Sequence, residues 1–552
     1  MSFVQLGGQP VKAFAGHFHY VPPRISYVQT VNRLESNLTS TISGFCTCLA
    51  MLRSLPLLKK AITLDEALSE DDDILQELSY PEKRLDFFYY LFQHRTEIEA
   101  IVSFHLGISK DVCKAGEVKE WVHGSFNACV PIYIDDSPKI PKKVFIRFPL
   151  PYKVGESHYR GNAEEKLRCE FTAPANAPLL ASIALFFQRR ASWLFGYSVP
   201  CQYVGRQSRH TLEAGYLIVD CVEEGKMLSE SWETLRHDLD RRTILFRDLS
   251  RIILSLGRFP FPRIGSLTID NCGVLSLTNR PLTCTLQQLE NLGIPTDIPR
   301  DQTYSSTDMY FADLLAYHDN RMRYMPNSIH SASDGQEQLS ALTMMRAMFR
   351  HFTNRNLRDG PFVLTLTDLH QSNIFVDSNW HITAIIDLEW ACARPIEMQH
   401  PPYWLTSCSL DGLDGEELEV YSSVHAEFME AFEIEERSLG QGDIPQAQIM
   451  RKGWEIGSYW FLSALDCPKG LYNLYLQHIR PKFAQPEESG ADFDRASSAY
   501  WSAGTAEFIV AKLRDKEVYI NQLREKFTAD VDEMRNMDNS KHPAVASSSL
   551  SW

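Results

Sequence analysis

Apolar residues recur at helical spacing in the segment RLDFFYYLFQHRTEIEAIVSFHL, which begins at Arg84 and runs toward Ile108. Side chains that repeat every three or four positions fall on one face of a helix. The pattern therefore predicts one or two helices that pack against the rest of the chain. The stretch just before it, LDEALSEDDDILQELSYPEK, is dense in charge and predicts a solvated connection between helices.

Strand-like runs replace this pattern further along the chain. EWVHGSFNACVPIYI and KKVFIRFPLP are rich in β-branched and aromatic residues, and the turn-forming DDSPKIP separates them. Together the segments predict a β-hairpin.

After about residue 232 the pattern is mainly helical, with strand-like exceptions at FVLTL, NIFVD and ITAIID. The last two runs lie on either side of the turn DSNW, so residues 374–376 and 382–386 predict a second antiparallel hairpin. The tail from Pro543 is small and polar and predicts disorder.

Composition narrows the class of protein. A chain of 552 residues can bury a large core, and 44% apolar with 23% charged residues is ordinary for a globular enzyme. The net charge of −15 repels phosphate backbones, which argues against nucleic acid as the main partner. The 12 cysteines lack CxxC spacing, so neither a zinc ribbon nor a secreted disulfide framework is indicated.

Targeting signals also bear on where the protein works. The amino terminus MSFVQLGGQPVKAF lacks a basic start followed by an apolar core, and no run of about 18 apolar residues occurs in the sequence. We therefore expect a cytoplasmic protein without a membrane partner.

Residues with ligand and acid–base chemistry gather around the second hairpin. In LTLTDLHQSNIFVD, Asn373 directly precedes the first strand, and in HITAIIDLEWA, Asp387 directly follows the second. Both fall at the same open end, where an amide oxygen and a carboxylate could share Mg²⁺. Asp368 lies on the same connection, close enough to accept the proton of an attacking hydroxyl. The alternative is that Asp368 and Asn373 only cap a turn.

Along this segment the chain has D-x-H-x-x-N, then an apolar strand, a turn and I-I-D. This order resembles the catalytic and metal-binding segment of the aminoglycoside phosphotransferase-like family, especially its fungal branch. The resemblance implies an α+β, protein-kinase-like bilobal fold, with a small, mainly β N-lobe and a larger, mainly helical C-lobe. It implies ATP and Mg²⁺ as cofactors. Asp368 would be the catalytic base, Asn373 and Asp387 the metal ligands, and His370 a residue that braces the loop.

The first hairpin resembles the strands that cover the nucleotide in this family. The resemblance places Gly124, Ser125 and Asn127 at the turn that covers the phosphates. The alternative is an ordinary hairpin turn, which would have the same sequence. Arg147 stands where relatives have a lysine or arginine that binds the α- and β-phosphates. The alternative is that Arg147 is simply an exposed positive side chain on a strand.

Other segments extend the resemblance. Glu170 in NAEEKLRCE resembles the helix glutamate that pairs with the phosphate-binding cation, with Glu164 and Glu165 as weaker alternatives. AGYLIVDCVEEGKML resembles the strand and hinge that cradle adenine, so Asp220, Cys221 and Val222 would border the base. A buried strand ending in a charged turn is the alternative.

Two departures from the family pattern affect these expectations. Pro174 and Pro178 interrupt the segment after Glu170, where relatives continue a helix and then a strand. If no helix holds Glu170, its pairing with Arg147 fails and activity is low. Leu366 stands where many relatives have a histidine two residues before the catalytic aspartate.

We therefore expect residues 1–114 to form a mainly helical extension, 115–230 an N-lobe and hinge, 231–480 a C-lobe, and 481–552 a helical segment and tail. The expected function is ATP- and Mg²⁺-dependent phosphoryl transfer to a hydroxyl of a small molecule. A pseudokinase-like binding or scaffold protein is the alternative. Acidic residues after the metal segment either attract a cationic acceptor or begin a solvated helix; they are Asp411, Asp414, Glu416 and Glu417.

Overall fold

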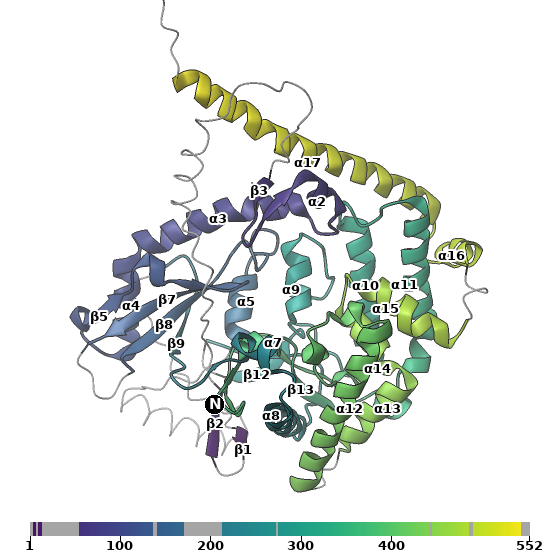
Figure 1. The fold of residues 1–552 in the computed structure, drawn as a ribbon, viewed down its shortest axis with the longest axis horizontal. Helices are drawn as coiled ribbons and strands as arrows, with labels where there is room; N and C mark the ends of the chain where they lie inside the picture. Colours follow the sequence, from purple (N-terminus) through teal and green to yellow (C-terminus); the bar gives the residue numbers. More distant parts are fainter. Residues whose placement is uncertain are drawn as a thin grey trace, which may run out of the picture.

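The computed structural model describes residues 4–6, 9–13, 54–135, 141–170, 212–271, 274–440, 444–484 and 490–541. Side chains are described from Ser54 onward and as far as Thr528. The chain is a mixture of helices and small β-sheets (Figure 1). No helix within these ranges is long and apolar enough to cross a membrane. The predictions for the segment after Glu170 and for the tail from Pro543 lie outside the described residues.

The first predicted hairpin is confirmed and belongs to a larger antiparallel sheet. β7 and β8 pair from Asn127 opposite Pro149 to Tyr133 opposite Lys143. The sheet runs in the order β5-β7-β8-β9, and β6 also pairs with β7. Its strands are β5 (Cys113–Ala115), β6 (Val122–His123), β7 (Asn127–Ile134), β8 (Lys143–Pro149) and β9 (Leu217–Asp220).

The two faces of this sheet have different partners, because successive strand residues point to opposite sides. Val130 and Ile146 pack with residues of α3 (Ile74–Gln93) and α4 (Arg95–Leu106) in one hydrophobic cluster. Cys129 and Phe145 belong to another cluster with Val219. Arg147 is the cross-strand partner of Cys129 and so lies on that second face.

The helices predicted near Arg84 are confirmed, but they begin earlier than the pattern suggested. α3 spans Ile74–Gln93 and α4 spans Arg95–Leu106. The Asp73 side chain accepts a hydrogen bond from Gln76 N and so caps the start of α3. Much of the stretch expected to be a solvated connection is therefore helical, including α2 (Leu64–Ser69). Its charged side chains are exposed or half-buried, while Ile74 and Tyr80 are buried.

The second predicted hairpin is also confirmed. β14 (Ile374–Val376) and β15 (Ile382–Ile385) pair antiparallel, with Ile374 opposite Ile385. The sheet runs in the order β1-β2-β15-β14-β10, with β1 (Val4–Leu6), β2 (Gln9–Ala13) and β10 (Lys226–Met227). Because β2 runs parallel to β15, residues near the start of the sequence extend the sheet that carries the candidate metal segment.

Shorter strand pairs complete the sheets. The predicted strand FVLTL is β13 (Phe362–Leu366), and it pairs with β16 (Ala391–Pro395). β16 was not predicted, and neither were β11 (Ser266–Ile269) and β12 (Leu275–Asn279), since such short runs carry little periodicity. β3 (Ser54–Pro56) pairs with β4 (Ala61–Thr63).

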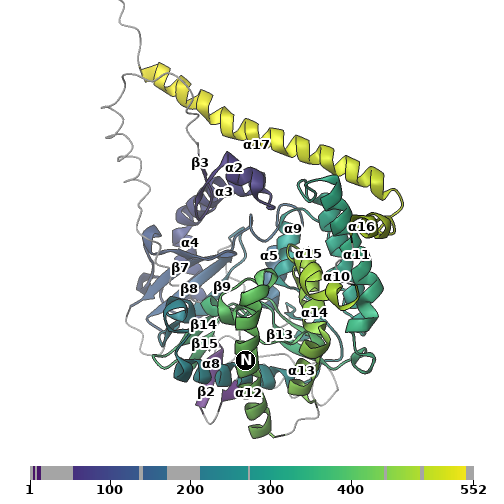
Figure 2. The same ribbon diagram turned by 45° about the vertical axis from the view of Figure 1, so that its right-hand side comes forward.

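The region after residue 232 is mainly helical and packs around a large hydrophobic core (Figures 1 and 2). α5 (Asn162–Cys169) lies between the β7–β8 sheet and α9 in both views. The helices of this region are α7 (Trp232–Leu235), α8 (Leu239–Gly257), α9 (Cys284–Asn291), α10 (Thr307–Tyr324), α11 (Ala332–Phe352), α12 (Gly415–Ser438), α13 (Gln446–Ile456), α14 (Ser458–Asp466), α15 (Leu471–Leu474) and α16 (Ala491–Ser498).

The long helix α17 (Thr505–Lys541) runs along one edge of the molecule in both views. The Tyr519 hydroxyl accepts a hydrogen bond from Ile74 N at 2.8 Å and donates one to Asp72 O at 3.2 Å. The ammonium group of Lys512, a residue only 3% exposed, donates to Met325 O at 2.7 Å. α17 therefore joins the start of α3 to the end of α10.

Replacing Tyr519 by phenylalanine tests this junction. Tyr519→Phe keeps the ring but removes the hydroxyl that accepts from Ile74 N and donates to Asp72 O, and leaves Ile74 N with only the Asp72 oxygen at 3.0 Å. We therefore expect a loss of about 0.5–1.5 kcal/mol in the free energy of unfolding. Tyr500→Phe is the matched control, because Tyr500 is 84% exposed. Thermal unfolding would be followed for both variants, and equal midpoints would contradict the structural role of the Tyr519 hydroxyl.

Candidate active site

Asp368 and Asn373 are held together on the connection between β13 and β14. The Asn373 side-chain amide donates to the backbone oxygen of Asp368 at 2.8 Å and to its Oδ2 at 3.1 Å. Asn373 is 1% exposed, and its Oδ1 has no hydrogen-bond partner within the described chain. A buried amide oxygen without a partner is an unusual group that a hard cation would satisfy.

Asp387 follows β15 at the same end of the hairpin. Ile386 N donates to Asn373 O at 2.9 Å, which closes that end and brings the two segments together. Asp387 has a φ of 58°, in the left-handed region that few residues other than glycine adopt. Such a conformation persists only where the surroundings enforce it, and it often marks a functional site.

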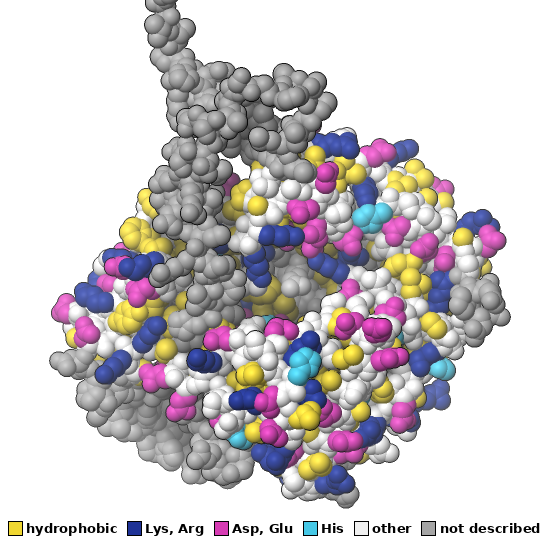
Figure 3. Space-filling model, viewed as in Figure 1, with side chains coloured by type: hydrophobic (Ala, Val, Ile, Leu, Met, Phe, Trp, Pro, Cys, Tyr) yellow, Lys and Arg dark blue, Asp and Glu magenta, His cyan; other side chains and the backbone are white. Residues whose placement is uncertain are grey.

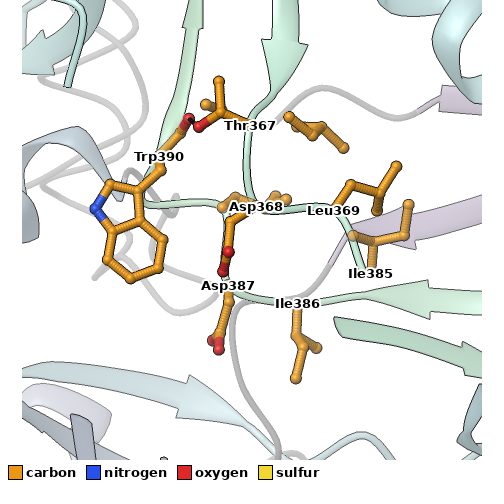
Figure 4. A pocket seen from close by; sticks show the side chains of 10 residues that line it. Thr367, Asp368, Leu369, Ile385, Ile386, Asp387 and Trp390 are labelled. Carbon is orange, nitrogen blue, oxygen red and sulfur yellow. Dashed lines mark hydrogen bonds between the residues drawn. The ribbon is translucent and has the colours of Figure 1, made fainter. Parts of the chain in front are cut away.

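Asp368 and Asp387 line the same small pocket (Figure 4). The Asp368 side chain points toward Asp387, and the Asp387 side chain continues in the same direction. The pocket has a volume of about 10 Å³, roughly what one water molecule requires. The structure therefore brings together Asp368, Asn373 and Asp387, but the space between the carboxylates is far smaller than a nucleotide.

Arg147 reaches this site from the other sheet. Its guanidinium contacts Glu170 Oε1 at 2.5 Å, Asp387 Oδ1 at 2.9 Å and Glu389 Oε1 at 2.7 Å. The Arg147 side chain is 2% exposed, so the alternative of an exposed strand cation is wrong. The expected contact between Arg147 and Glu170 is present.

Glu389 and Lys166 belong to the same cluster and were missed from the sequence. Both side chains are 0% exposed, and Lys166 Nζ lies 2.7 Å from Glu389 Oε1. A signal was available for each: Glu389 lies two positions after Asp387, and Lys166 lies four positions before Glu170, one turn along a helix. Neither signal shows that the residue is buried, because lysine and glutamate usually lie at the surface.

The turn before β7 contributes to this cluster through Asn127. Gly124 N donates to Asn127 O at 2.9 Å, which closes a tight turn that includes Ser125. The Asn127 side chain accepts from Lys166 Nζ at 2.7 Å and donates to Glu389 Oε1 at 3.1 Å. Asn127 therefore links the buried Lys166 and Glu389, while Gly124 is half-buried and Ser125 exposed in the adjoining turn.

The expected hinge residues connect the two larger sheets. Asp220 ends β9 and pairs with Val144 of β8. Cys221 packs against the cluster that contains Phe145, and Val222 packs against the cluster of Met227 and Phe375. The chain thus runs through Asp220, Cys221 and Val222 from the sheet that carries Arg147 to the sheet at whose end Asp387 lies.

The loop that carries Asp368 is braced by its neighbours. His370 Nδ1 lies 2.9 Å from Ser372 Oγ, and its Nε2 lies 3.7 Å from Asp368 Oδ2. Burial lowers the pKa of His370. Trp404 Nε1 donates to Leu369 O at 2.7 Å. Leu366 packs against the main hydrophobic core, so an apolar side chain supports the loop at that position.

Glu170 keeps its position although α5 is short. Both oxygens of Glu156 accept backbone N–H groups at the start of α5, from Gly161 at 2.7 Å and Ala163 at 2.8 Å. Glu165, which was an alternative partner for Arg147, instead pairs with Arg280 at 2.9 Å. A helix of two turns is marginal by itself, so these contacts explain how Glu170 is held.

The electrostatic environment differs among the carboxylates. Burial, followed by the negative charges of Glu389 and Asp387, raises the pKa of Asp368 to about 7. Burial raises the pKa of Asp387 to about 6, although Arg147 opposes the shift. For Glu389 the opposing effect of Arg147 and Lys166 outweighs burial, and its pKa falls to about 2.

For the pKa of Glu170, burial outweighs the attraction of nearby cations, which is the reverse of the balance at Glu389. Burial raises the pKa of Glu170 against the attraction of Arg147, and its Oε2 has no hydrogen-bond partner among the described residues. One oxygen each from Glu170, Asp387 and Glu389 lie within 4.8 Å of one another, close enough to hold a metal ion. The cluster thus carries more carboxylates than cations, which favours uptake of protons or of a divalent cation.

Comparisons with known proteins add little to this geometry. No protein-family model and no curated protein matches the sequence. Among solved structures, the macrolide 2′-phosphotransferase MphH from Brachybacterium faecium is 13% identical and covers 74% of this chain and 98% of its own, with a TM-score of 0.29. A macrolide 2′-phosphotransferase of type I is 10% identical over 71% of this chain and 94% of its own, also with a TM-score of 0.29. These TM-scores are too low to bear on fold or function.

The raised pKa of Asp368 predicts a pH-dependent change in stability. The folded protein binds the proton of the Asp368 carboxyl more tightly than the unfolded chain, in which aspartate has its ordinary pKa of 3.8. The stabilisation from this proton is therefore complete below pH 3.8. It is lost as pH rises through about 7. Asp368→Asn stays neutral, so we expect it to unfold at a higher temperature than wild type at pH 8 without Mg²⁺.

The difference between Asp368→Asn and wild type should disappear near pH 4. Asp359→Asn, at an exposed position, is the matched control and should leave the melting temperature unchanged across this range. Melting temperatures of all three proteins would be measured at intervals from pH 4 to pH 8. A constant difference for Asp368→Asn at every pH would show that Asp368 is not a buried acid with a raised pKa.

Removing the charge of Glu389 tests the buried ion cluster. Glu389→Gln leaves Arg147 and Lys166 without the anion between them, and breaking such a buried pair costs about 3–5 kcal/mol. Glu164→Gln is the control, since Glu164 is 65% exposed and pairs with Arg168 on the same helix; we expect less than about 1 kcal/mol there. Unfolding by denaturant would be compared, and similar midpoints would refute the structural role of Glu389.

Proposed function

We propose that this protein is an ATP- and Mg²⁺-dependent phosphotransferase that acts on a hydroxyl group of a small molecule. The observation that carries the proposal is the convergence of Asp368, Asn373 and Asp387 opposite Arg147, which is paired with Glu170. Within this proposal the fold is protein-kinase-like and bilobal. Residues 115–230 form the small N-lobe and hinge, 231–480 the helical C-lobe, and 1–114 and 481–552 accessory segments.

The residues present fit a magnesium ion. Mg²⁺ prefers oxygen ligands. The Oδ1 of Asn373, which has no hydrogen-bond partner among the described residues, and the carboxylate of Asp387 supply them at one end of the hairpin. When bound, Mg²⁺ would neutralise charge on the transferred phosphoryl group. Arg147 lies beside Asp387 at 2.9 Å and would bind the phosphates that approach from the same side.

Asp368 is the proposed catalytic base. Its carboxylate is oriented by the Asn373 amide at 3.1 Å and can accept the proton of the acceptor hydroxyl as the phosphoryl group is transferred. Such reactions depend mainly on positioning and on charge stabilisation. His370 and Trp404 keep the loop in place through their contacts with Ser372 and Leu369.

A pseudokinase-like binding protein is the second candidate, and a specific observation favours it. Arg147 contacts Asp387 at 2.9 Å, and the pocket beside Asp387 has a volume of about 10 Å³. Nucleotide binding therefore requires the pocket beside Asp387 to widen. If that widening is too costly, the protein would keep the fold without turnover.

For the acceptor we propose a small molecule with a free hydroxyl. A cationic acceptor is favoured by the net charge of −15, although the Asp414 carboxylate is already used to cap the start of α12. Acidic and basic side chains are intermixed over the described part of the face in Figure 3. The net charge also supports the expectation that nucleic acid is not a partner, and we propose a cytoplasmic location.

Mg-ATP binding and two isosteric substitutions test the function. Saturation at 100 times the dissociation constant should stabilise the wild-type fold by about 2.7 kcal/mol. Asp368→Asn removes the proposed base but keeps its shape, so nucleotide affinity should survive while turnover falls by roughly 10² to 10⁴. Asp387→Asn removes charge from the proposed metal site, so both affinity and turnover should fall.

Nucleotide affinity would be measured by calorimetry, and turnover by phosphorylation of acceptors in a metabolite screen or by slow ATP hydrolysis. A thermal transition unchanged by millimolar Mg-ATP would refute both the enzyme and the nucleotide-binding pseudoenzyme. Binding without turnover in the wild type would favour the pseudokinase. Equal loss of affinity in Asp368→Asn and Asp387→Asn would refute the assignment of the base.

A further inference from the structure

A groove of about 710 Å³ lies between α3 and the turn that joins β8 to α5. Its lining differs entirely from that of the pocket at Asp368 and Asp387. Small-molecule sites in proteins usually have volumes of about 300–1,000 Å³. The groove is therefore large enough for an organic ligand.

Two basic and two acidic side chains line the groove, and one of the two acids is already engaged by α5. Lys83 of α3 and Arg160 of the turn are both exposed and line the groove. The Glu156 carboxylate also lines it, but both of its oxygens accept N–H groups at the start of α5. Asp86 is the remaining acidic group in the lining. The formal charges balance, but the Glu156 carboxylate is directed to the start of α5, so Lys83 and Arg160 face a single remaining carboxylate, that of Asp86, and can also pair with a negative group of a ligand.

Aromatic side chains form the apolar part of the groove. Phe87 and Tyr152 line it from opposite elements. Tyr152 is 7% exposed, and its hydroxyl has no hydrogen-bond partner in the described parts of the chain. Buried hydroxyl groups are normally satisfied, so this one offers a further contact beside the aromatic surface.

We propose that this groove binds a small anionic molecule with an aromatic body. We further propose that the bound molecule tightens Mg-ATP binding at the candidate active site, a step that rests on the proposed function. The negative group pairs with Lys83 and Arg160, and the aromatic body packs against Phe87 and Tyr152.

The turn at the groove is connected to the candidate active site through α5. Glu156 bonds to the first residues of α5, and the same helix carries Lys166, which contacts Glu389 at 2.7 Å. On the other side, Gly155 N donates to Asn291 Oδ1 at 3.0 Å, and Asn291 Nδ2 donates to the Tyr80 hydroxyl of α3 at 2.8 Å. A ligand that joins α3 to this turn holds α5 in the position in which Lys166 contacts Glu389 and Glu170 contacts Arg147.

The probe 8-anilinonaphthalene-1-sulfonate, an aromatic anion, tests the groove directly by its fluorescence. Lys83→Gln/Arg160→Gln should weaken binding of the probe at least tenfold. The matched control is Lys110→Gln/Lys119→Gln, which removes the same charge at exposed positions outside the groove and should leave affinity unchanged. Equal affinities in the two double variants would overturn the proposed site, and circular dichroism would verify that both variants are folded.

Asp387→Asn distinguishes the groove from the candidate active site. Asp387→Asn should leave the affinity for the probe unchanged. If Asp387→Asn lost more probe affinity than Lys83→Gln/Arg160→Gln, the probe would bind at Asp387 and the proposal would be overturned. The coupling is measured as the dissociation constant of Mg-ATP with and without saturating probe. We expect about a fivefold or larger decrease in the wild type and no change in Lys83→Gln/Arg160→Gln.

Probe binding that depends on Lys83 and Arg160 but leaves Mg-ATP affinity unchanged would overturn the coupling. If the wild type binds no Mg-ATP at all, the proposed function and the coupling fail together. Loss of probe affinity in Lys83→Gln/Arg160→Gln would still support the anion-binding groove in that case.

Discussion

The Glu389 carboxylate lies between Arg147 and Lys166, at 2.7 Å from each and without exposure to solvent. A buried cation is very costly unless an anion and hydrogen bonds compensate it. Arg147 comes from β8, Lys166 from α5 and Glu389 from the segment after β15. These elements are far apart in the sequence, and the need to pair their charges brings them to one point. Asp387, two positions before Glu389, is placed by the same constraint.

The cluster depends in turn on contacts farther from the site. α5 is too short to be stable alone, and it is held by Glu156 at its start and by the Glu165–Arg280 pair along its side. Arg280 also pairs with Glu290 at 2.6 Å, and the neighbouring Asn291 bonds to Tyr80 of α3. The N-terminal helices thus contribute to the position of Lys166 and Glu170, although the family resemblance assigned them no role.

The site combines strain and an excess of negative charge. Asp387 has a positive φ, Asn373 carries a buried oxygen without a partner in the described chain, and Asp368 has a pKa raised to about 7. Each feature costs stability in the protein without ligands. Features that reduce stability at one place are typical of functional sites. A bound cation would offset two of them, because it would satisfy the Asn373 oxygen and compensate the negative charge around Asp368.

The sequence by itself determined the local elements and the spacing of the polar residues. Strand-like runs separated by turn residues indicated the hairpins, and helical periodicity indicated α4 and the later part of α3. The position of Asn373 and Asp387 at the ends of adjacent strands required them to lie close together. These are short-range consequences of backbone geometry. The tertiary structure alone decided that Lys166 and Glu389 belong to the site, that Asn127 is buried between their charges, and that Arg147 faces inward. Whether a charged side chain is buried depends on partners hundreds of residues away, and a single sequence carries no signal for that pairing.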